Sequence, residues 1–466
     1  MRISLACGVV GLLIVGCVGG CGSDGESSAG APGGAGGASG GTGGSGGSAG
    51  SAGGGTGGSS GSSGAAGSGG TSGSSGTAGS GATGGSSGAG TGGTGGSAGT
   101  STDGGAGTSG TGGTGGQAPC HLASKWTVVD DYVRSPGEPS NVSGIAAASD
   151  GAVYAVGPAK QGTFAGFVRK SVDGGKNWTF ANWTTGVPND VAADDAGNVY
   201  VIAGFNGRVL RKSDDGGQSW DDLDTIPMNG GPSDPCNTGF VATGGQGIVV
   251  IGASCDSTGW VVRRSANSGM TWQPAFTFQL ASSKASRLSD VAVIDGDAYG
   301  IGTGIDTSDA SHWVAVRGNG AIADQFALTS GQPASGYGFG GKAVAFSAGF
   351  ATESGTGTGV VRRRAAGGTW STVDRFGSRA NDVVVVENQV IAVGGTDSAS
   401  GESVTTRRSD DGGTTWRPLD DYKYMNGTGS SSGQLTADPR GNVYAAISAR
   451  DSGGANHWVV RKLACE

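Results

Sequence analysis

The chain repeats one octapeptide four times: SVDGGKNW (171–178), SDDGGQSW (213–220), SANSGMTW (265–272) and SDDGGTTW (409–416). A fifth copy, AAGGTW (365–370), keeps only the second half of the pattern. Recurrence at a regular spacing is the signature of a repeat architecture, so the residues around the octapeptide define the unit of the fold.

The flanks of the octapeptide repeat as well, and they have the composition of β-strands. A β-branched run that ends in basic residues, such as VVRR (261–264), precedes each copy. Before that run lie two more apolar stretches joined by a tight turn, as in DVVVVENQVIAVG (382–394). Each unit therefore predicts four antiparallel strands, A to D, with the octapeptide in the C–D turn. This is one blade of a β-propeller.

The number of units predicts an all-β, seven-bladed propeller. The first strands of the units are expected to start at Gly144, Asp190, Gly239, Asp290, Lys342, Asp382 and Gln434. The fourth unit has no recognisable octapeptide, because its equivalent, RGNGAIADQF (317–326), has drifted. The seventh unit ends after its third strand, HWVVRKL (457–463).

The missing last strand lies at the other end of the folded sequence. KWTVVDDY (125–132) matches the fourth strand WRPLDDY (416–422), so the N-terminal strand is predicted to complete the last blade and leave no free sheet edge. Cys120 and Cys465 then flank the last C–D junction, and we expect a disulfide between them. Cys236 and Cys255 fall on one face of blade three, which predicts a second disulfide.

The form S-x-D/N-x-G-x-x-W resembles the Asp box of the bacterial neuraminidase repeat (BNR), which is typical of sialidase-like propellers. In such a turn the carboxylate accepts backbone N–H groups, the glycine supplies positive φ and the tryptophan packs between sheets. The structural Asp-box residues are Ser171, Asp173, Gly175, Trp178, Ser213, Asp215, Gly217, Trp220, Ser265, Asn267, Gly269, Trp272, Ser409, Asp411, Gly413 and Trp416. Asn267 in place of aspartate suits a turn cap and not a shared catalytic acid.

The resemblance does not extend to catalysis. Sialidases use an arginine triad, a Tyr–Glu pair, an aspartic acid/base and an early Arg-Ile-Pro-like motif, and they have six blades. The Arg-Ile-Pro-like motif does not occur in this sequence, and most of its arginines stand at the octapeptide end of the third strands. The resemblance therefore implies a fold without implying an activity.

The first 20 residues read as a secretory signal, with Arg2 followed by an apolar stretch from Ile3 to Val18. VGGC (18–21) resembles the lipobox of bacterial lipoproteins, whose cysteine carries the lipid. Cys21 is preferred because cleavage before it leaves an even set of four cysteines. IVGC (14–17) fits the same pattern, so Cys17 is the alternative, and a secreted protein without a lipid is a third possibility.

Residues 21–117 are expected to form a disordered tether. They hold 45 of the 102 glycines, the rest being almost wholly Ser, Ala and Thr, and cannot bury a core. The propeller is then 118–466, which is enough sequence for one large domain, with a formal charge of −6 from 28 basic and 34 acidic residues. Because no basic block is present, nucleic acid is not expected as a partner. We expect a monomer in the cell envelope, held at the outer membrane or cell surface through its lipid.

Candidate ligand residues follow from the loops at the B–C and D–A ends of the blades. Asp190, Asp290 and Asp382 would form an acidic lip on the central channel that attracts a cation, or would cap turns. Trp183 and Phe205 offer aromatic surface for sugar rings. No HExxH, GxSxG or P-loop pattern occurs, so neither a metal nor a cofactor is expected.

These features favour a surface-tethered, non-catalytic binding or scaffold propeller for glycan or protein ligands. A carbohydrate-active exo-glycosidase of the sialidase superfamily is the alternative, with two carboxylates drawn from Asp290, Asp306, Asp309, Asp382 and Glu402. A third hypothesis is an assembly factor for a membrane complex, similar to those that assist photosystem assembly. That class typically uses a basic patch, which this sequence does not show.

Overall fold

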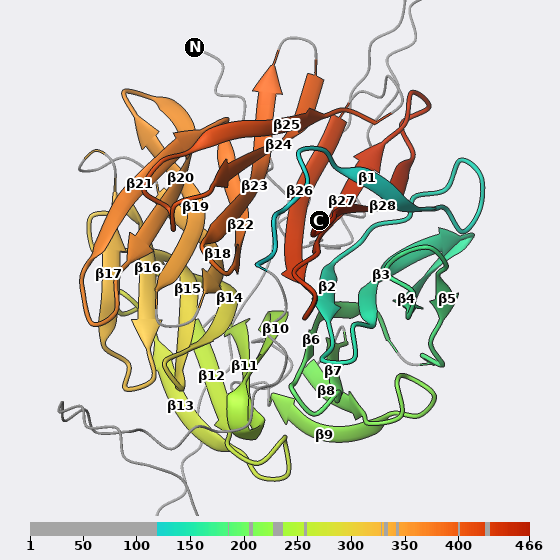
Figure 1. Cartoon of the computed structure of the whole chain (residues 1–466). Helices are drawn as coiled ribbons and strands as arrows, with labels where there is room; N and C mark the ends of the chain where they lie inside the picture. Colours follow the sequence, from blue (N-terminus) through green and yellow to red (C-terminus); the bar gives the residue numbers. More distant parts are fainter. Residues whose placement is uncertain are drawn as a thin grey trace, which may run out of the picture. The chain divides into compact units, whose positions relative to one another are not determined.

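The computed structural model describes residues 119–466 except 185, 205–207, 227–235, 256–258, 328, 330–333, 342–343, 399–400 and 425–428. Its strands form seven antiparallel sheets of four strands each, which we number as blades 1 to 7 in chain order. The all-β, seven-bladed propeller expected from the repeats is therefore confirmed (Figure 1). No described helix has the length and apolar character that crossing a bilayer requires.

Each of the first three blades uses four strands that are consecutive in the chain. Blade 1 contains β2 (Gly144–Ala147), β3 (Val153–Gln161), β4 (Thr163–Ser171) and β5 (Thr179–Phe180). Blade 2 contains β6 (Pro188–Ala193), β7 (Val199–Ala203), β8 (Arg208–Ser213) and β9 (Asp221–Ile226). Blade 3 contains β10 (Cys236–Gly244), β11 (Ile248–Cys255), β12 (Gly259–Ser265) and β13 (Gln273–Phe278).

The next three blades follow the same order. Blade 4 contains β14 (Ser286–Ile294), β15 (Asp297–Ile305), β16 (Ser311–Arg317) and β17 (Ile322–Phe326). Blade 5 contains β18 (Ala334–Gly341), β19 (Ala345–Glu353), β20 (Thr356–Arg364) and β21 (Trp370–Phe376). Blade 6 contains β22 (Arg379–Val386), β23 (Gln389–Ser398), β24 (Gly401–Ser409) and β25 (Arg417–Tyr422).

Blade 7 joins the two ends of the folded chain. It contains β26 (Gly429–Ala437), β27 (Val443–Arg450), β28 (Asn456–Leu463) and, as its outer strand, β1 (Thr127–Tyr132). Asp130 of β1 pairs with Val460 of β28, and Trp126 just before β1 is buried. The predicted closure by the N-terminal strand is therefore confirmed.

The first strands of successive blades touch one another around the whole ring, from β2 through β6, β10, β14, β18 and β22 to β26 and back to β2. Apolar side chains of adjacent sheets form the core between the blades. The largest fully buried side chains include Trp260, Trp313 and Trp458, which occupy equivalent positions at the start of the third strand in blades 3, 4 and 7. These tryptophans pack between blades and present no surface to a ligand.

A disulfide and a buried arginine hold the N-terminal segment in place. Cys120 is bonded to Cys465, as predicted. Arg408 of blade 6 donates through Nη1 to the carbonyl oxygens of Leu122 (2.7 Å) and Ala123 (3.1 Å). Since Arg408 is only 7% exposed, these hydrogen bonds are shielded from water and stabilise the closure of the ring by the N-terminal segment.

Cys236 and Cys255 are opposite each other in the β10–β11 ladder, and Cys255 is disulfide-bonded. Directly opposed residues in an antiparallel pair have Cα atoms at a separation that a disulfide spans. The side chain of Cys236 lies outside the described residues, so Cys236 as the partner stays a prediction.

The four Asp-box segments form the C–D turns of blades 1, 2, 3 and 6 with one shared set of hydrogen bonds. In blade 6 the Ser409 hydroxyl donates to Asp411 Oδ1 (2.8 Å) and accepts the backbone N–H of Gly413 (2.8 Å). Asp411 Oδ1 also accepts the N–H of Thr415 (2.8 Å). Asn267 makes the equivalent bonds in blade 3, so the turn needs an oxygen acceptor and not a charge.

The turn chemistry gives a prediction. Asp411→Asn should leave the melting temperature almost unchanged because asparagine keeps Oδ1, whereas Asp411→Ala should lower it because the N–H groups lose their acceptor. Thermal unfolding followed by circular dichroism checks both variants. Equal melting temperatures for Asp411→Ala and the natural protein would contradict a capping role.

Ion pairs connect the third strand of one blade to the outer strand of the blade before it. The pairs are Arg169–Asp130, Arg263–Asp224, Arg362–Asp324, Arg407–Asp374 and Arg461–Asp420. These arginines belong to the basic ends of the third strands, three of which precede a full octapeptide. Their role is thus to join neighbouring blades.

Two of the seven junctions lack this pair. Between blades 1 and 2 the outer strand β5 is too short to supply the aspartate, and Arg211 pairs with Asp222 of its own blade. Between blades 3 and 4 the equivalent positions are Phe276 and Val316, which lie buried in one apolar cluster. Both partners have changed together at that junction.

The predicted start of blade 5 is wrong. Lys342 lies outside the described residues, and the first strand of this blade, Ala334–Gly341, begins and ends before it. Its glycine-rich sequence has low β-propensity, which conceals the strand. The glycines are required by close packing, since a Cβ on Gly340 would lie 2.1 Å from the carbonyl oxygen of Val383 in blade 6.

Candidate functional site

The three aspartates predicted on the central channel bond to neighbouring blades. Each lies at a bulge of its first strand, in blades 2, 4 and 6. Asp190 Oδ2 accepts the backbone N–H of Val241 in blade 3 at 3.0 Å. In the same way, Asp290 Oδ2 accepts the N–H of Phe339 in blade 5 at 3.1 Å. Asp382 Oδ2 accepts the N–H of Leu435 in blade 7 at 2.7 Å. Each aspartate therefore joins its blade to the next.

These contacts are hydrogen bonds between blades, and the acidic lip on the channel stays a prediction. Asp190 is 9% exposed, and Asp290 and Asp382 are only partly exposed. Among the described residues no group of three or more His, Cys, Asp or Glu side chains is placed to hold a metal ion. The geometry thus assigns the three carboxylates to the inside of the ring.

Burial raises the pKa of Asp190 and of Asp382 to about 7, although each carboxylate accepts two backbone N–H groups. Burial and the charges of Asp190 and Asp382 also raise the pKa of Asp290 well above its ordinary value. A carboxyl whose pKa is higher in the folded than in the unfolded state binds its proton more tightly when folded. The stability that it contributes is therefore present below its unfolded pKa of about 4 and is lost as pH rises through about 7.

We expect the melting temperature to fall between about pH 5 and about pH 8, and to fall less in the Asp190→Asn/Asp382→Asn double variant. Thermal unfolding across that range measures both slopes. Asp411→Asn is the control, because its carboxyl has a lowered pKa and does not titrate there. An unchanged slope in the double variant would show that other groups cause the pH dependence.

Of the two aromatic candidates, only Trp183 is described, and it contacts its own chain. Trp183 is half-buried, donates through Nε1 to the carbonyl oxygen of Gly186 (3.1 Å), and packs edge-on against the Asp-box residue Trp220 (centroids 5.1 Å apart). It fills the junction between blades 1 and 2, where the interblade ion pair is missing. Phe205, Cys21 and Cys17 lie outside the described residues.

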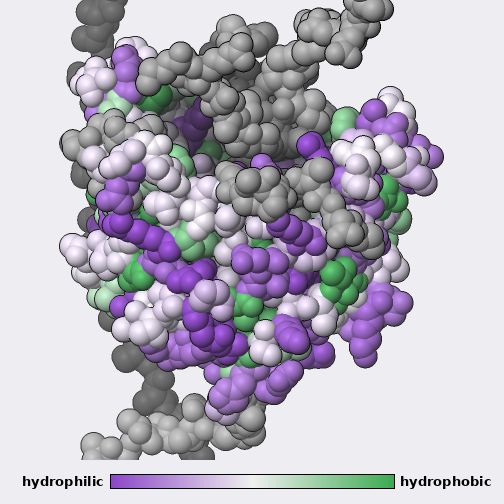
Figure 2. Space-filling view, turned by 90° about the horizontal axis from the view of Figure 1, so that it is seen from above, coloured by the Kyte–Doolittle hydropathy of each residue, from purple (hydrophilic) through white to green (hydrophobic). Residues whose placement is uncertain are grey.

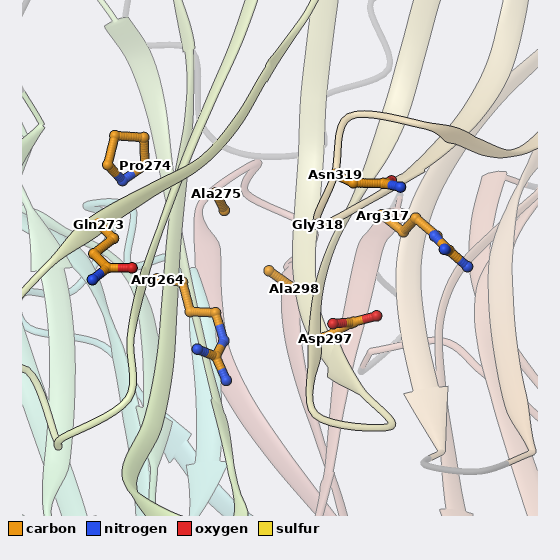
Figure 3. Close-up of a pocket in the computed structure, with 9 residues that line it drawn as sticks. All are labelled: Arg264, Gln273, Pro274, Ala275, Asp297, Ala298, Arg317, Gly318 and Asn319. Atoms are coloured by element: carbon orange, nitrogen blue, oxygen red, sulfur yellow. The ribbon is translucent and has the colours of Figure 1, made fainter.

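A pocket of about 390 Å³ lies between blades 3 and 4, at the end of the blades that carries the Asp-box turns (Figure 3). Blade 3 contributes Arg264, Gln273, Pro274 and Ala275. Blade 4 contributes Asp297, Ala298, Arg317, Gly318 and Asn319. This volume falls within the range of small-molecule sites in proteins.

The pocket exists because blade 4 has lost its Asp box. In strand register, the three residues Gly318–Gly320 stand where blade 6 has the eight residues Ser409–Trp416. In blades 1 and 3 the box packs on the outer strand of the preceding blade, as Gly175 does on Val129 and Gly269 on Leu223. The residue equivalent to Leu223 and Val129 in blade 3 is Ala275, which has no box above it and lines the pocket.

The missing box also deprives Arg264 of its usual partner. At the equivalent position Lys170 and Lys462 each donate through Nζ to a box carbonyl of the next blade, those of Gly216 and Gly174 (3.2 Å each). Arg264 has no Asp-box carbonyl to reach. It donates through Nη2 to the backbone carbonyl oxygen of Gly296 at 3.3 Å. Its remaining guanidinium N–H groups have no partner among the described residues.

The other polar groups of the pocket are also largely uncommitted. Arg317 and Asp297 are exposed, and neither forms an ion pair with a described residue. Asn319 accepts the N–H of Ala321 through Oδ1 (3.1 Å), which leaves its NH₂ group for a ligand. The pocket thus offers two guanidinium groups, side-chain amides and one carboxylate.

Four of the five carboxylates proposed for hydrolysis already have hydrogen-bond or ion-pair partners within the protein. Asp306 accepts from the Ser308 hydroxyl (2.7 Å) and lies 2.8 Å from His312 Nε2. Asp309 pairs with Lys284 at 2.5 Å. Asp290 and Asp382 join blades, as described above, and no contact brings Glu402 to any of them among the described residues.

Sequence reasoning missed the residues of the pocket. The available signal was the drifted segment 317–326, in which the C–D turn is shorter than in the other blades. A second signal was the joint replacement of arginine by Val316 and of aspartate by Phe276. Only the strand register shows that both changes meet at one junction.

No protein-family model and no curated protein sequence matches this chain. Among solved structures it is similar to YCF48 bound to D1 peptide (15% identity, TM-score 0.45, 75% of this chain and 99% of that one). It is also similar to a protein of unknown function from Dyadobacter fermentans, with 12% identity and a TM-score of 0.44 over 73% of this chain and 99% of that one. A third similar structure is a GH93 α-L-arabinofuranosidase of Fusarium graminearum bound to arabinobiose, with 12% identity and a TM-score of 0.42 over 73% of this chain and 98% of that one. At these identities and TM-scores the similarities carry no conclusion about function.

Proposed function

We propose that this chain is a surface-tethered, non-catalytic binding propeller. The observation that carries the proposal is the pocket between blades 3 and 4, which has hydrogen-bond donors and acceptors but a single carboxylate, Asp297. Hydrolysis of a glycosidic bond by the usual route needs two carboxylates on opposite sides of the bond. The pocket therefore favours binding over hydrolysis.

The described surface favours a polar ligand. On the face seen in Figure 2, hydrophilic residues predominate and apolar ones are scattered singly. The large apolar side chains that are exposed, such as Val172, Met270 and Ile322, belong to different blades. Large apolar patches mark many protein and membrane interfaces, and the described part of this face has none.

The test uses the full mature chain on an array of neutral and acidic glycans, beside a panel of fluorogenic glycosides that includes sialosides and arabinofuranosides. We expect saturable binding on the array and no release of fluorophore. Turnover of any glycoside that is lost in Asp297→Asn would overturn the non-catalytic assignment. Absence of binding to every glycan would remove the support for a glycan ligand.

The tether is part of the same proposal, and its lipid attachment gives a prediction of its own. Cys21→Ser should move the protein from the membrane fraction to the soluble fraction and abolish labelling by a fatty acid analogue. Cys17→Ser is the matched control and should keep both. Retention of the label in Cys21→Ser with its loss in Cys17→Ser would assign the lipid to Cys17 instead.

A further inference from the structure

We propose that the pocket between blades 3 and 4 binds a carboxylate-bearing sugar, with Arg264 receiving the carboxylate and Asp297 receiving hydroxyl groups. This inference rests on the proposed function and names the class of its ligand. The pocket lies where other blades have an Asp box. A ligand bound there would make contacts that the box makes in those blades.

The first argument is the Asp-box carbonyl that Arg264 lacks, which leaves it with the carbonyl oxygen of Gly296 at 3.3 Å as its acceptor among the described residues. At two other junctions the equivalent lysine donates to a carbonyl oxygen of the neighbouring box at 3.2 Å. A ligand oxygen in the pocket would occupy the corresponding place for Arg264. Because a guanidinium group presents several N–H donors in one plane, a carboxylate matches it better than a single carbonyl does.

The second argument is charge. The pocket has two arginines and one aspartate, a formal charge of +1, in a domain whose formal charge is −6. A singly charged carboxylate balances this charge. A phosphate carries close to two negative charges and would be repelled by Asp297, so the carboxylate is favoured.

The third argument is the hydroxyl groups. Asp297 is exposed at the pocket and, when ionised, only accepts hydrogen bonds. Gln273 and Asn319 add amide groups that donate and accept. A ligand that satisfies these groups presents several hydroxyls as well as its carboxylate, which is the chemistry of a uronic acid.

The fourth argument is shape. Figure 3 shows Arg264 and Gln273 on one side of the pocket and Asp297, Arg317 and Asn319 on the other, with Ala298 between them. Pro274 and Ala275 are the other apolar lining residues. Small apolar side chains leave room for the C–H face of a sugar ring, while the polar groups reach its edge.

The experiment titrates the full chain with D-glucuronic acid, D-galacturonic acid, D-glucose and inorganic phosphate, using saturation-transfer NMR and thermal unfolding. We expect the uronic acids to bind at least about tenfold more tightly than glucose and phosphate, and their affinity to fall as salt rises. Equal binding of glucose and the uronic acids would overturn the role of Arg264. Tighter binding of phosphate would overturn the carboxylate assignment.

Two variants place the ligand in the pocket. The double variant Arg264→Ala/Arg317→Ala should weaken uronic acid binding at least about tenfold. The control Arg375→Ala removes an exposed arginine of blade 5 and should leave binding unchanged. Binding that survives in the double variant would exclude the pocket as the site.

Restoring the Asp box gives the most specific variant. Replacing Gly318–Gly320 with the sequence of Ser409–Trp416 should fill the pocket, supply the carbonyl that Arg264 lacks, and abolish uronic acid binding. The melting temperature should be maintained or raised, which shows that the fold is intact. Uronic acid binding that survives in this variant would overturn the inference about this pocket, while the proposed binding function of the chain would stand.

Discussion

Replacing both Cys120 and Cys465 with serine is expected to lower the free energy of unfolding by about 2–5 kcal/mol. The disulfide joins residues 345 positions apart, so its loss frees almost the whole folded chain in the unfolded state. Unfolding of the natural and variant proteins in urea, with and without reductant, measures the difference.

The matched control keeps the disulfide and changes an exposed residue of β1, the strand that follows Cys120; Val128→Thr should cost far less. Reductant should destabilise the natural protein and have a much smaller effect on the serine variant. The same stability for the natural and variant proteins would mean that the disulfide does not hold the ring closed.

The second large effect concerns the buried pair Arg362–Asp324, whose side chains are 8% and 9% exposed. Asp324→Ala should lower the free energy of unfolding by about 3–5 kcal/mol, because it leaves a buried guanidinium without its carboxylate. Burial raises the pKa of Asp324 despite the arginine, which shows how costly the buried charge is.

The chain itself supplies the compensating change. The double variant Arg362→Val/Asp324→Phe reproduces the Val316 and Phe276 combination of the junction between blades 3 and 4. We expect it to regain much of the stability lost in Asp324→Ala, since an apolar pair replaces a buried ion pair at little net cost. Urea unfolding of both variants measures the recovery, and a double variant less stable than Asp324→Ala would contradict the equivalence of the two junctions.

Features that depend on local sequence were predictable. The Asp-box turn bonds residues within four positions of one another, as Ser409, Asp411 and Gly413 do, so its sequence is sufficient to identify it. Closure by the N-terminal strand was predictable because its strand sequence repeats that of blade 6.

Features that depend on the register between blades were not predictable. The basic runs were visible in the sequence, but their aspartate partners are distant in the chain and belong to another sheet, as Asp374 does, 33 residues from Arg407. The same is true of Asp190, which bonds to Val241 of the next blade. The first strand of blade 5 was hidden because its glycines serve interblade packing and carry no strand signal.

The candidate site was the least predictable part. It consists of residues that the repeat leaves without partners, such as Arg264, and of a turn that is shorter than its equivalents. A single sequence shows that Gly318–Gly320 departs from the pattern. It does not show that Ala275 of the previous blade is uncovered as a result.

The position of every surface named above depends on closure of the ring by β1. Amide hydrogen exchange of the oxidised full chain tests this most directly, by comparing β1 (Thr127–Tyr132) with its partner strand β28 (Asn456–Leu463). The structure predicts that the paired amides of both strands exchange slowly and at similar rates. Rapid exchange throughout β1 with slow exchange in β28 would show that the N-terminal strand does not close the propeller.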